Sequence, residues 1–340
     1  MLFLVFLASW LISPHESSLL GFIGILDLCH LMGINLHLAG ENQTNALVIK
    51  DILTQVRLPR TLVVLLSGAS LALAGALSQG IFRNSLASPS VVGSQSGGVL
   101  FAVIGFSLAE YYHWPVMIPV LTILGCMLAH SLISGVFYYF SGRGGIAGDD
   151  LVILGFAIHL FLGGLTTMFL SFNLADVEKS LAILKWLFGS YAMANWSDVW
   201  LMMITMTLGG VIAFSHSRDL DVFSLSNDEA RSLSLNTERL RQIMLFGISV
   251  LIGGSVASAG GIPFVGLMAP HIARLFVGGN HQWLFRVSLI IGPILTLLCD
   301  TIARSLRYPE ELETGIILTI LGGPFFIFLL WRKRTSALTE

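Results

Sequence analysis

Few residues in this chain have the types and spacing that catalysis needs. No Gly-Lys-Ser or Gly-Lys-Thr step occurs, so the sequence has no phosphate-cradling loop of the Walker type. It also lacks His-Glu-x-x-His, Gly-x-Ser-x-Gly and paired carboxylates within apolar segments. The glycine-rich segment 141–150 is better interpreted as a tight turn between helices. These observations argue against an ATPase and against an intramembrane enzyme.

Ionisable side chains inside the apolar segments are few, and His159 and Asp300 stand out among them. Burying such a group in a membrane costs several kcal/mol, so it is a functional candidate by default. A single neutral histidine is more often a hydrogen-bonded packing residue, so we favour packing for His159 over a place on a pathway. Asp300 precedes Arg304 by four positions, a spacing that predicts a helical ion pair.

This scarcity of charge separates two mechanisms of transport. Ion-coupled carriers usually need titratable or ion-coordinating residues near the middle of the membrane. The segments here are mainly apolar and small, which disfavours an ion-coupled secondary carrier. The energy for transport is then expected to come from another subunit.

The composition indicates an all-α integral membrane protein. Of 340 residues, 55% are hydrophobic and 11% are charged, against about 25% charged in soluble domains. The formal net charge of −2 gives no reason to expect nucleic acid as a partner. Cys29, Cys126 and Cys299 are too widely spaced to form a metal-ligand pattern or a disulfide framework. We therefore expect a single transmembrane domain over residues 1–340, surrounded by membrane lipid.

Apolar runs that could cross a membrane recur along the whole chain. They lie at about 1–13, 61–82, 91–109, 116–140, 150–171, 197–215, 242–260, 263–278, 285–304 and 314–331. The first is short for a span, which needs about 20 residues. Ten spans place both termini on one side. Eleven of the 18 Lys and Arg fall on the inner side if both termini are cytoplasmic, which favours that orientation.

Small residues repeat every four positions in two of these runs. Gly68, Ala72, Ala76 and Gly80 share one helix face, and Gly253 begins a similar stripe with Ala257 and Gly261. Such stripes let helices approach closely within lipid. The two runs enter from opposite sides, which is consistent with the inverted repeat that many transporters use.

The longest inner loop, residues 217–242, contains its own helix signals. Ser226 and Glu229 form a capping box, which predicts a short helix through Leu235. Asn236 or Thr237 can cap a second short helix through Arg241. The sequence predicts either a rigid helical knob or a solvated loop with local helix.

Several basic residues fall on the outer side, against the usual bias. Arg57 and Arg60 precede the second span, and Arg304 and Arg307 close the ninth. Lys and Arg in short loops normally stay on the cytoplasmic side. A basic pair on the outer face therefore suggests a docking surface for an acidic partner.

Six strings in this order resemble the permease subunits of bacterial ABC importers for iron–siderophore complexes, haem and cobalamin. They are Arg57-Leu-Pro-Arg60, Gln79 with the run from Arg83 to Pro89 and Gly93, Trp186 to Ser190, Phe264 to Arg274, Asp300 to Arg304, and Gly322 to Phe325. Ser85 and Pro263 depart from the family pattern, as do Ser226, Ser234 and Glu313 in the loops. The resemblance runs from about Arg57 to Trp331.

The resemblance implies a multi-pass permease of the bacterial inner membrane. It implies a dimer with a second copy or a paralogous permease, two ATP-binding subunits beneath it and a periplasmic or lipoprotein substrate-binding protein above it. Arg57, Arg60 and Arg304 would face glutamates of the binding protein. The inner loop at about 217–242 would be the coupling segment that contacts the ATPases. Its contact residues would be Ser226, Glu229, Ala230, Arg231 and Leu233.

On this interpretation the chain is no enzyme and has no cofactor of its own, because ATP is bound by the partner subunit. Gln79 and His159 are the candidate pathway or packing residues, and no metal ligands are predicted. The expected cargo is an iron–siderophore complex. Haem, cobalamin and a molybdate-type oxyanion remain alternatives.

Overall fold

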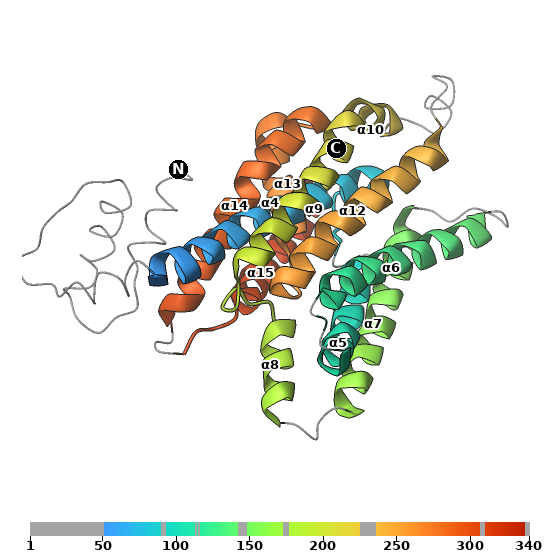
Figure 1. Ribbon diagram of the computed structural model, residues 1–340. Coiled ribbons are helices and arrows are strands. Elements are labelled where there is room, and N and C mark those ends of the chain that lie inside the picture. Colours follow the sequence, from blue (N-terminus) through green and yellow to red (C-terminus); the bar gives the residue numbers. More distant parts are fainter. Residues whose placement is uncertain are drawn as a thin grey trace, which may run out of the picture.

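The computed structural model describes residues 51–89, 93–112, 114, 116–141, 148–172, 177–224, 236–306 and 310–336. Every regular element within these ranges is a helix (Figure 1), as the composition predicts. The predicted first span at 1–13 lies outside the described residues. So do the predicted coupling residues Ser226, Glu229, Ala230, Arg231 and Leu233, and Arg307.

A short π-helix, η1, opens the described part of the chain, and α-helices follow it. Their bounds are η1 Leu53–Arg57, α4 Leu58–Ile81, α5 Ser94–Tyr112, α6 Met117–Ser141, α7 Gly148–Phe172, α8 Val177–Leu187, α9 Trp196–Ser215, α10 Ser217–Phe223, α12 Thr237–Ala259, α13 Val265–Val277, α14 His281–Leu306 and α15 Thr314–Ser336.

Every predicted span beyond the first coincides with one of these helices. Within the described ranges, six helical stretches are long and apolar enough to cross a membrane, namely η1 with α4, α6, α7, α9, α12 and α14. The prediction of a full span at 263–278 needs correction, because α13 has 13 residues and rises about 20 Å. That is less than the roughly 30 Å of a hydrocarbon core.

Helix α4 lies at the centre of the bundle and packs against α14, α12, α13 and α9 (Figure 1). Its small residues explain this position. A Cβ on Gly68 would collide with the Gly292 carbonyl of α14, and one on Gly75 would collide with the Gly266 carbonyl of α13. The helices can therefore approach to backbone contact, which replaces the hydrophobic drive that is missing between helices in lipid.

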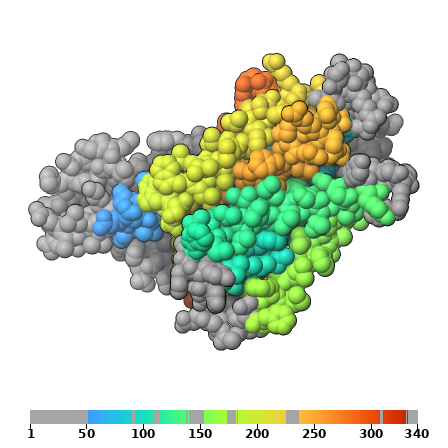
Figure 2. All heavy atoms as spheres, turned by 45° about the vertical axis from the view of Figure 1, so that its right-hand side comes forward, coloured from blue at the N-terminus to red at the C-terminus, as the bar shows by residue number. Residues whose placement is uncertain are grey.

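Helices α5, α6 and α7 form a second group beside the central one (Figure 1). Gly97 of α5 and Gly125 of α6 meet at backbone distance. Helix α12 joins the two groups because it packs against both α4 and α6, and Figure 2 shows α12 between α9 and α6 on one face. Large apolar side chains such as Leu128 and Phe161 remain exposed on α6 and α7, as expected of surfaces that face lipid or another subunit.

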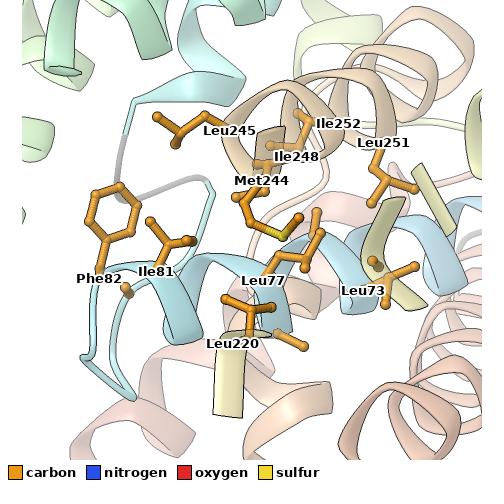
Figure 3. Close-up of a cluster of buried hydrophobic side chains, with 14 of the residues drawn as sticks. Leu73, Leu77, Ile81, Phe82, Leu220, Met244, Leu245, Ile248, Leu251 and Ile252 are labelled. Atoms are coloured by element: carbon orange, nitrogen blue, oxygen red, sulfur yellow. The ribbon is translucent and has the colours of Figure 1, made fainter. Parts of the chain in front are cut away.

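One apolar cluster near one end of α4 includes buried residues of α4, α10, α12 and α14, among other helices (Figure 3). Leu77 of α4, Met244 and Ile248 of α12, and Leu220 of α10 are fully buried in it, together with Phe285 of α14. Helix α4 ends here and α14 begins here. We call this end of the bundle the α10 end, and the opposite end, where α4 begins and α14 ends, the arginine end.

The two ends of the inner loop 217–242 differ from what the sequence predicted. The Asn236 side chain does cap a helix, by accepting a hydrogen bond from the Arg239 amide at 3.0 Å. That helix does not stop at Arg241, because it continues as α12 to Ala259. No Gly or Pro stands between the cap and the apolar run that starts at Ile243, so nothing ends the helix at Arg241. Ser217–Phe223, at the other end of the predicted loop, forms the helix α10.

Candidate functional site

The arginine end holds an ion-pair cluster centred on Asp300. Its Oδ1 accepts a hydrogen bond from Arg60 Nη2 at 2.8 Å, and its Oδ2 lies 3.2 Å from Arg304 Nε. The second contact is the i,i+4 pair that the spacing predicts. Thr314 Oγ1 also donates to Asp300 Oδ1, at 3.2 Å. The Asp300 side chain, which is 2% exposed, thus ties the start of α4 to the end of α14 and the start of α15.

Glu311 is a further member of this cluster. Its Oε2 accepts a hydrogen bond from Arg60 Nη1 at 2.6 Å. The Glu311 side chain is 34% exposed, whereas that of Arg60 is 12% exposed. The Arg60 guanidinium therefore bonds one buried carboxylate and one that faces outward.

The arginines that we predicted as a docking surface are thus mostly covered. Arg304 is 13% exposed, which is close to the value for Arg60. Arg57, the last residue of η1, is half-buried, and its carbonyl accepts a hydrogen bond from Thr61 Oγ1 at 2.9 Å. Arg57 lies close enough to Arg304 for their charges to interact. With Arg57 counted, three arginines against Asp300 and Glu311 give a formal charge of 3 − 2 = +1. A partner carboxylate would compete with Glu311 for Arg60.

Gln79, a candidate for the pathway, is 2% exposed in α4. Its Nε2 lies 3.5 Å from the Leu267 carbonyl of α13, and its Oε1 has no hydrogen-bond partner among the described residues. The side chain lies between helices rather than on an open surface. Any role on a pathway would require α4 and α13 to separate.

His159, the other candidate, lies half-buried on α7. Its Nδ1 is hydrogen-bonded to Ser96 Oγ of α5, and its ring stacks on Phe156 with centroids 6.2 Å apart. The contact ties α5 to α7, the arrangement that a packing role requires. Whether His159 also contacts cargo stays a prediction.

A second intramembrane histidine was missed by the sequence reasoning. His130 of α6 is 3% exposed and lies between Ser94 Oγ and Ser249 Oγ, each 2.7 Å from one ring nitrogen. This chain links α5, α6 and α12. His130 lies within the apolar run 116–140, and this position could have identified it, just as a position within the run 150–171 identified His159. Glu311 carried no such signal, because its partner Arg60 lies 251 positions away.

A family model described as the FecCD transport family matches residues 2–332. The chain belongs to the FecCD transport family. Membership confirms the resemblance to permeases of ABC importers. The chain is 34% identical over 283 residues to the Fe(3+)-citrate import system permease protein YfmD of Bacillus subtilis, covering 83% of this chain and 82% of that one.

Other comparisons agree with this assignment. The Iron(3+)-hydroxamate import system permease protein FhuG of Bacillus subtilis is 33% identical over 290 residues, covering 83% of this chain and 84% of its own. A solved ABC transporter in an inward-facing conformation, considered to be of the metal-chelate type, is similar with a TM-score of 0.75 and 29% identity, covering 97% of each chain. The chain is therefore a multi-pass transport permease with this helical fold.

Proposed function

We propose that this chain is the transmembrane subunit of an ATP-driven importer for a ferric chelate in the bacterial inner membrane. Family membership over nearly the whole chain supports this proposal most directly. The relatives named above are permeases for ferric citrate and ferric hydroxamate. The cargo class follows from those names, because the described residues offer no metal-ligand cluster that would select a metal.

The two ends of the bundle suit two different partners. We assign the α10 end to the cytoplasm, because Arg83, Arg241 and Arg274 gather there and basic residues favour that side. The ATP-binding subunits would then meet the segment that follows α10. The arginine end would face outward and receive a substrate-binding protein, with Arg57, Arg60 and Arg304 meeting its carboxylates. Both termini would be cytoplasmic.

A second permease copy would complete the pathway. The exposed apolar side chains on α7 and α15 include Phe161, Phe172 and Ile327, and both helices contain a glycine with open space beside it. Such faces can pack against lipid or against another helix. The chelate would pass between the two permeases, and this chain would bind neither ATP nor a cofactor of its own.

The test is reconstitution. The chain is purified alone and with its cognate ATP-binding subunit and binding protein, and each preparation is placed in proteoliposomes. We expect no ATP hydrolysis by the chain alone, and ATP-dependent uptake of ferric citrate or ferric hydroxamate by the complex. ATP turnover by the isolated chain, or chelate uptake driven by an ion gradient without ATP, would reject the proposal.

A further inference from the structure

Helix α10 connects the span α9 to the segment that contains the predicted coupling residues. It covers Ser217–Phe223, begins two residues after the end of α9, and is followed by residues 225–235. The proposed function places the ATPase contact in that following segment. A push on the segment can reach the spans efficiently only if α10 is fixed to them.

Asp221 fixes α10 to the first residue of α14. Its Oδ1 accepts hydrogen bonds from the His281 backbone amide at 2.9 Å and from His281 Nδ1 at 2.6 Å. Two donors from one residue define both the position and the orientation of the carboxylate. The contact joins residues 60 positions apart, so it reflects tertiary structure rather than local turn formation.

Arg83, two residues after the end of α4, binds the last residue of α10. Its Nε donates to the Phe223 carbonyl at 2.9 Å, and its guanidinium carbon lies 4.5 Å above the centre of the Phe223 ring. Arg83 has a φ of 48°, in the left-handed region that a side chain disfavours. Strain of this kind persists where surrounding contacts hold it, and it is common at functional positions.

Packing next to these two contacts leaves α10 little room to slide. Leu220 is fully buried among Leu77 and Met244 (Figure 3). Gly80 faces the same site, and a Cβ there would lie 2.9 Å from His281 Nε2 and 3.4 Å from Leu220. The end of α4, the start of α14 and α10 therefore meet in one packed junction.

We propose that Arg83, Asp221 and His281 form a latch that makes α10 move as one body with the α10 ends of α4 and α14. The latch would pass a displacement of the coupling segment to these two helices. At their other ends the same two helices are tied together by Arg60, Asp300 and Arg304. The latch thereby links the ATPase side to the docking side through one helix pair. These are positioning residues, and this role depends on the proposed function.

The first test replaces Asp221 in the complete transport complex. Asp221→Leu removes both hydrogen bonds to His281, whereas Asp221→Asn keeps an oxygen that can accept them. Asp219→Leu is the matched control, because it makes the same change on the same helix and the structure gives Asp219 no side-chain partner among the described residues. Chelate uptake and ATP hydrolysis are measured in the same proteoliposomes.

We expect Asp221→Leu to lower ferric citrate or ferric hydroxamate uptake per ATP about tenfold, while basal ATP hydrolysis stays within about twofold of wild type. Asp221→Asn should keep most of the coupling, and Asp219→Leu all of it. A second readout needs no cargo. Stimulation of ATP hydrolysis by the docked binding protein should be lost in Asp221→Leu alone.

The second test separates coupling from folding. Arg83→Gly relieves the left-handed backbone, so the protein should fold at least as well as wild type, yet it deletes both contacts to Phe223. We expect an unchanged or higher melting temperature together with uptake per ATP reduced about tenfold. Arg83→Lys keeps a cation over the ring and should retain more coupling than Arg83→Gly.

The outcomes distinguish the latch from the wider proposal. If wild type takes up no ferric chelate and shows no stimulation by the binding protein, the importer function fails and the latch fails with it. If wild type transports and both Asp221→Leu and Arg83→Gly couple like Asp219→Leu, only the latch is overturned. Equal loss in Asp221→Asn and Asp221→Leu would also overturn it, because the bonds to His281 would then not be the cause.

Discussion

Asp300 has more partners at the arginine end than the single ion pair that the sequence predicted. Its pair with Arg304 follows from the four-residue spacing within one helix. Its bond to Arg60 could not be predicted, because these residues are 240 positions apart and only the packing of α4 on α14 brings them together. Exposed arginines were the simplest interpretation of basic residues on an outer loop. The fold also uses two of them, Arg60 and Arg304, to neutralise a buried carboxylate.

Replacement of Asp300 by alanine should strongly destabilise the protein. The change would leave Arg60 and Arg304 nearly buried without that carboxylate, and breaking a buried pair costs about 3–5 kcal/mol. A clearly lower melting temperature of the detergent-purified protein is the expected result. Glu311→Gln serves as the control, because removing the charge of a more exposed partner should cost about 0–1 kcal/mol. Equal melting temperatures for Asp300→Ala and wild type would contradict the structural role of the cluster.

Glu311→Gln should also strengthen docking. The substitution raises the formal charge of the cluster from +1 to +2 and removes the carboxylate that occupies Arg60 Nη1. A carboxylate of the partner then no longer competes with Glu311 for Arg60. The measurement is the affinity of the substrate-binding protein for the permease in nanodiscs. Weaker binding by Glu311→Gln than by wild type would mean that Glu311 contributes to the docking surface rather than competing with the partner.

His159→Gln should keep most of the transport activity. Gln can preserve a hydrogen bond to Ser96, and such interhelical bonds are worth on the order of 1 kcal/mol in membranes. Uptake by the reconstituted complex is compared at equal amounts of folded protein. A complete loss of uptake at normal protein levels would place His159 on the pathway.

At the scale of elements, close helix packing should make Gly75 sensitive to even one added carbon. A Cβ on Gly75 would meet the backbone carbonyl of Gly266, which cannot swing aside as a side chain can. We expect Gly75→Ala to destabilise the protein by about 1–3 kcal/mol, the usual cost of overpacking. The melting temperature of the detergent-purified protein is the measurement.

Gly163→Ala is the matched control for that experiment. Gly163 lies on α7 with no atom of a neighbouring element within 4 Å of its ideal Cβ position. Alanine has a higher helix propensity than glycine, so this variant should be as stable as wild type or more stable. Similar destabilisation by both variants would point to a general glycine requirement rather than to the α4–α13 contact.

Long apolar helices could be predicted from the sequence, whereas the short elements between them could not. Hydropathy located every described span, because lipid forces each apolar run to satisfy its own backbone as a helix. Helices α8 and α10 were missed, since seven to eleven residues carry little periodic signal. The contacts of α10 come from Arg83 and His281, which are distant in the sequence. The latch therefore becomes visible only when the ends of three helices are placed together.

At the scale of the whole molecule, α4 and α14 connect the two charged ends. They lie side by side and are tied by Asp300 at one end and by the α10 latch at the other. Between these ends their contact is apolar and close, with Gly68 against Gly292. A pair of helices fixed at both ends transmits displacement better than a single flexible helix. In the proposed importer, this arrangement would offer a direct mechanical route between the binding protein and the ATP-binding subunits.

Docking at the arginine end should depend on charge and on salt. Arg57→Glu leaves the bonds of Arg60 to Asp300 and Glu311 in place but changes the cluster from +1 to −1, so it should repel an acidic partner. Asp51→Arg is the control of opposite sign, because the exposed Asp51 precedes η1 near the same end and its reversal adds positive charge. We expect Arg57→Glu to weaken binding-protein affinity at least tenfold and Asp51→Arg to leave it equal or tighter.

The salt dependence of binding-protein affinity shows whether Arg57→Glu weakens docking through its charge. Charges near the surface are screened beyond a Debye length of about 8 Å at physiological ionic strength. Wild-type affinity in nanodiscs should therefore fall as salt rises, and the difference between wild type and Arg57→Glu should shrink at high salt. If Arg57→Glu binds as tightly as wild type at low salt, the arginine end is not the docking surface, and the cluster serves only to hold α4, α14 and α15 together. A loss of binding that stays constant from low to high salt would instead indicate that Arg57 acts through local structure, because screening cannot restore a contact that has been lost.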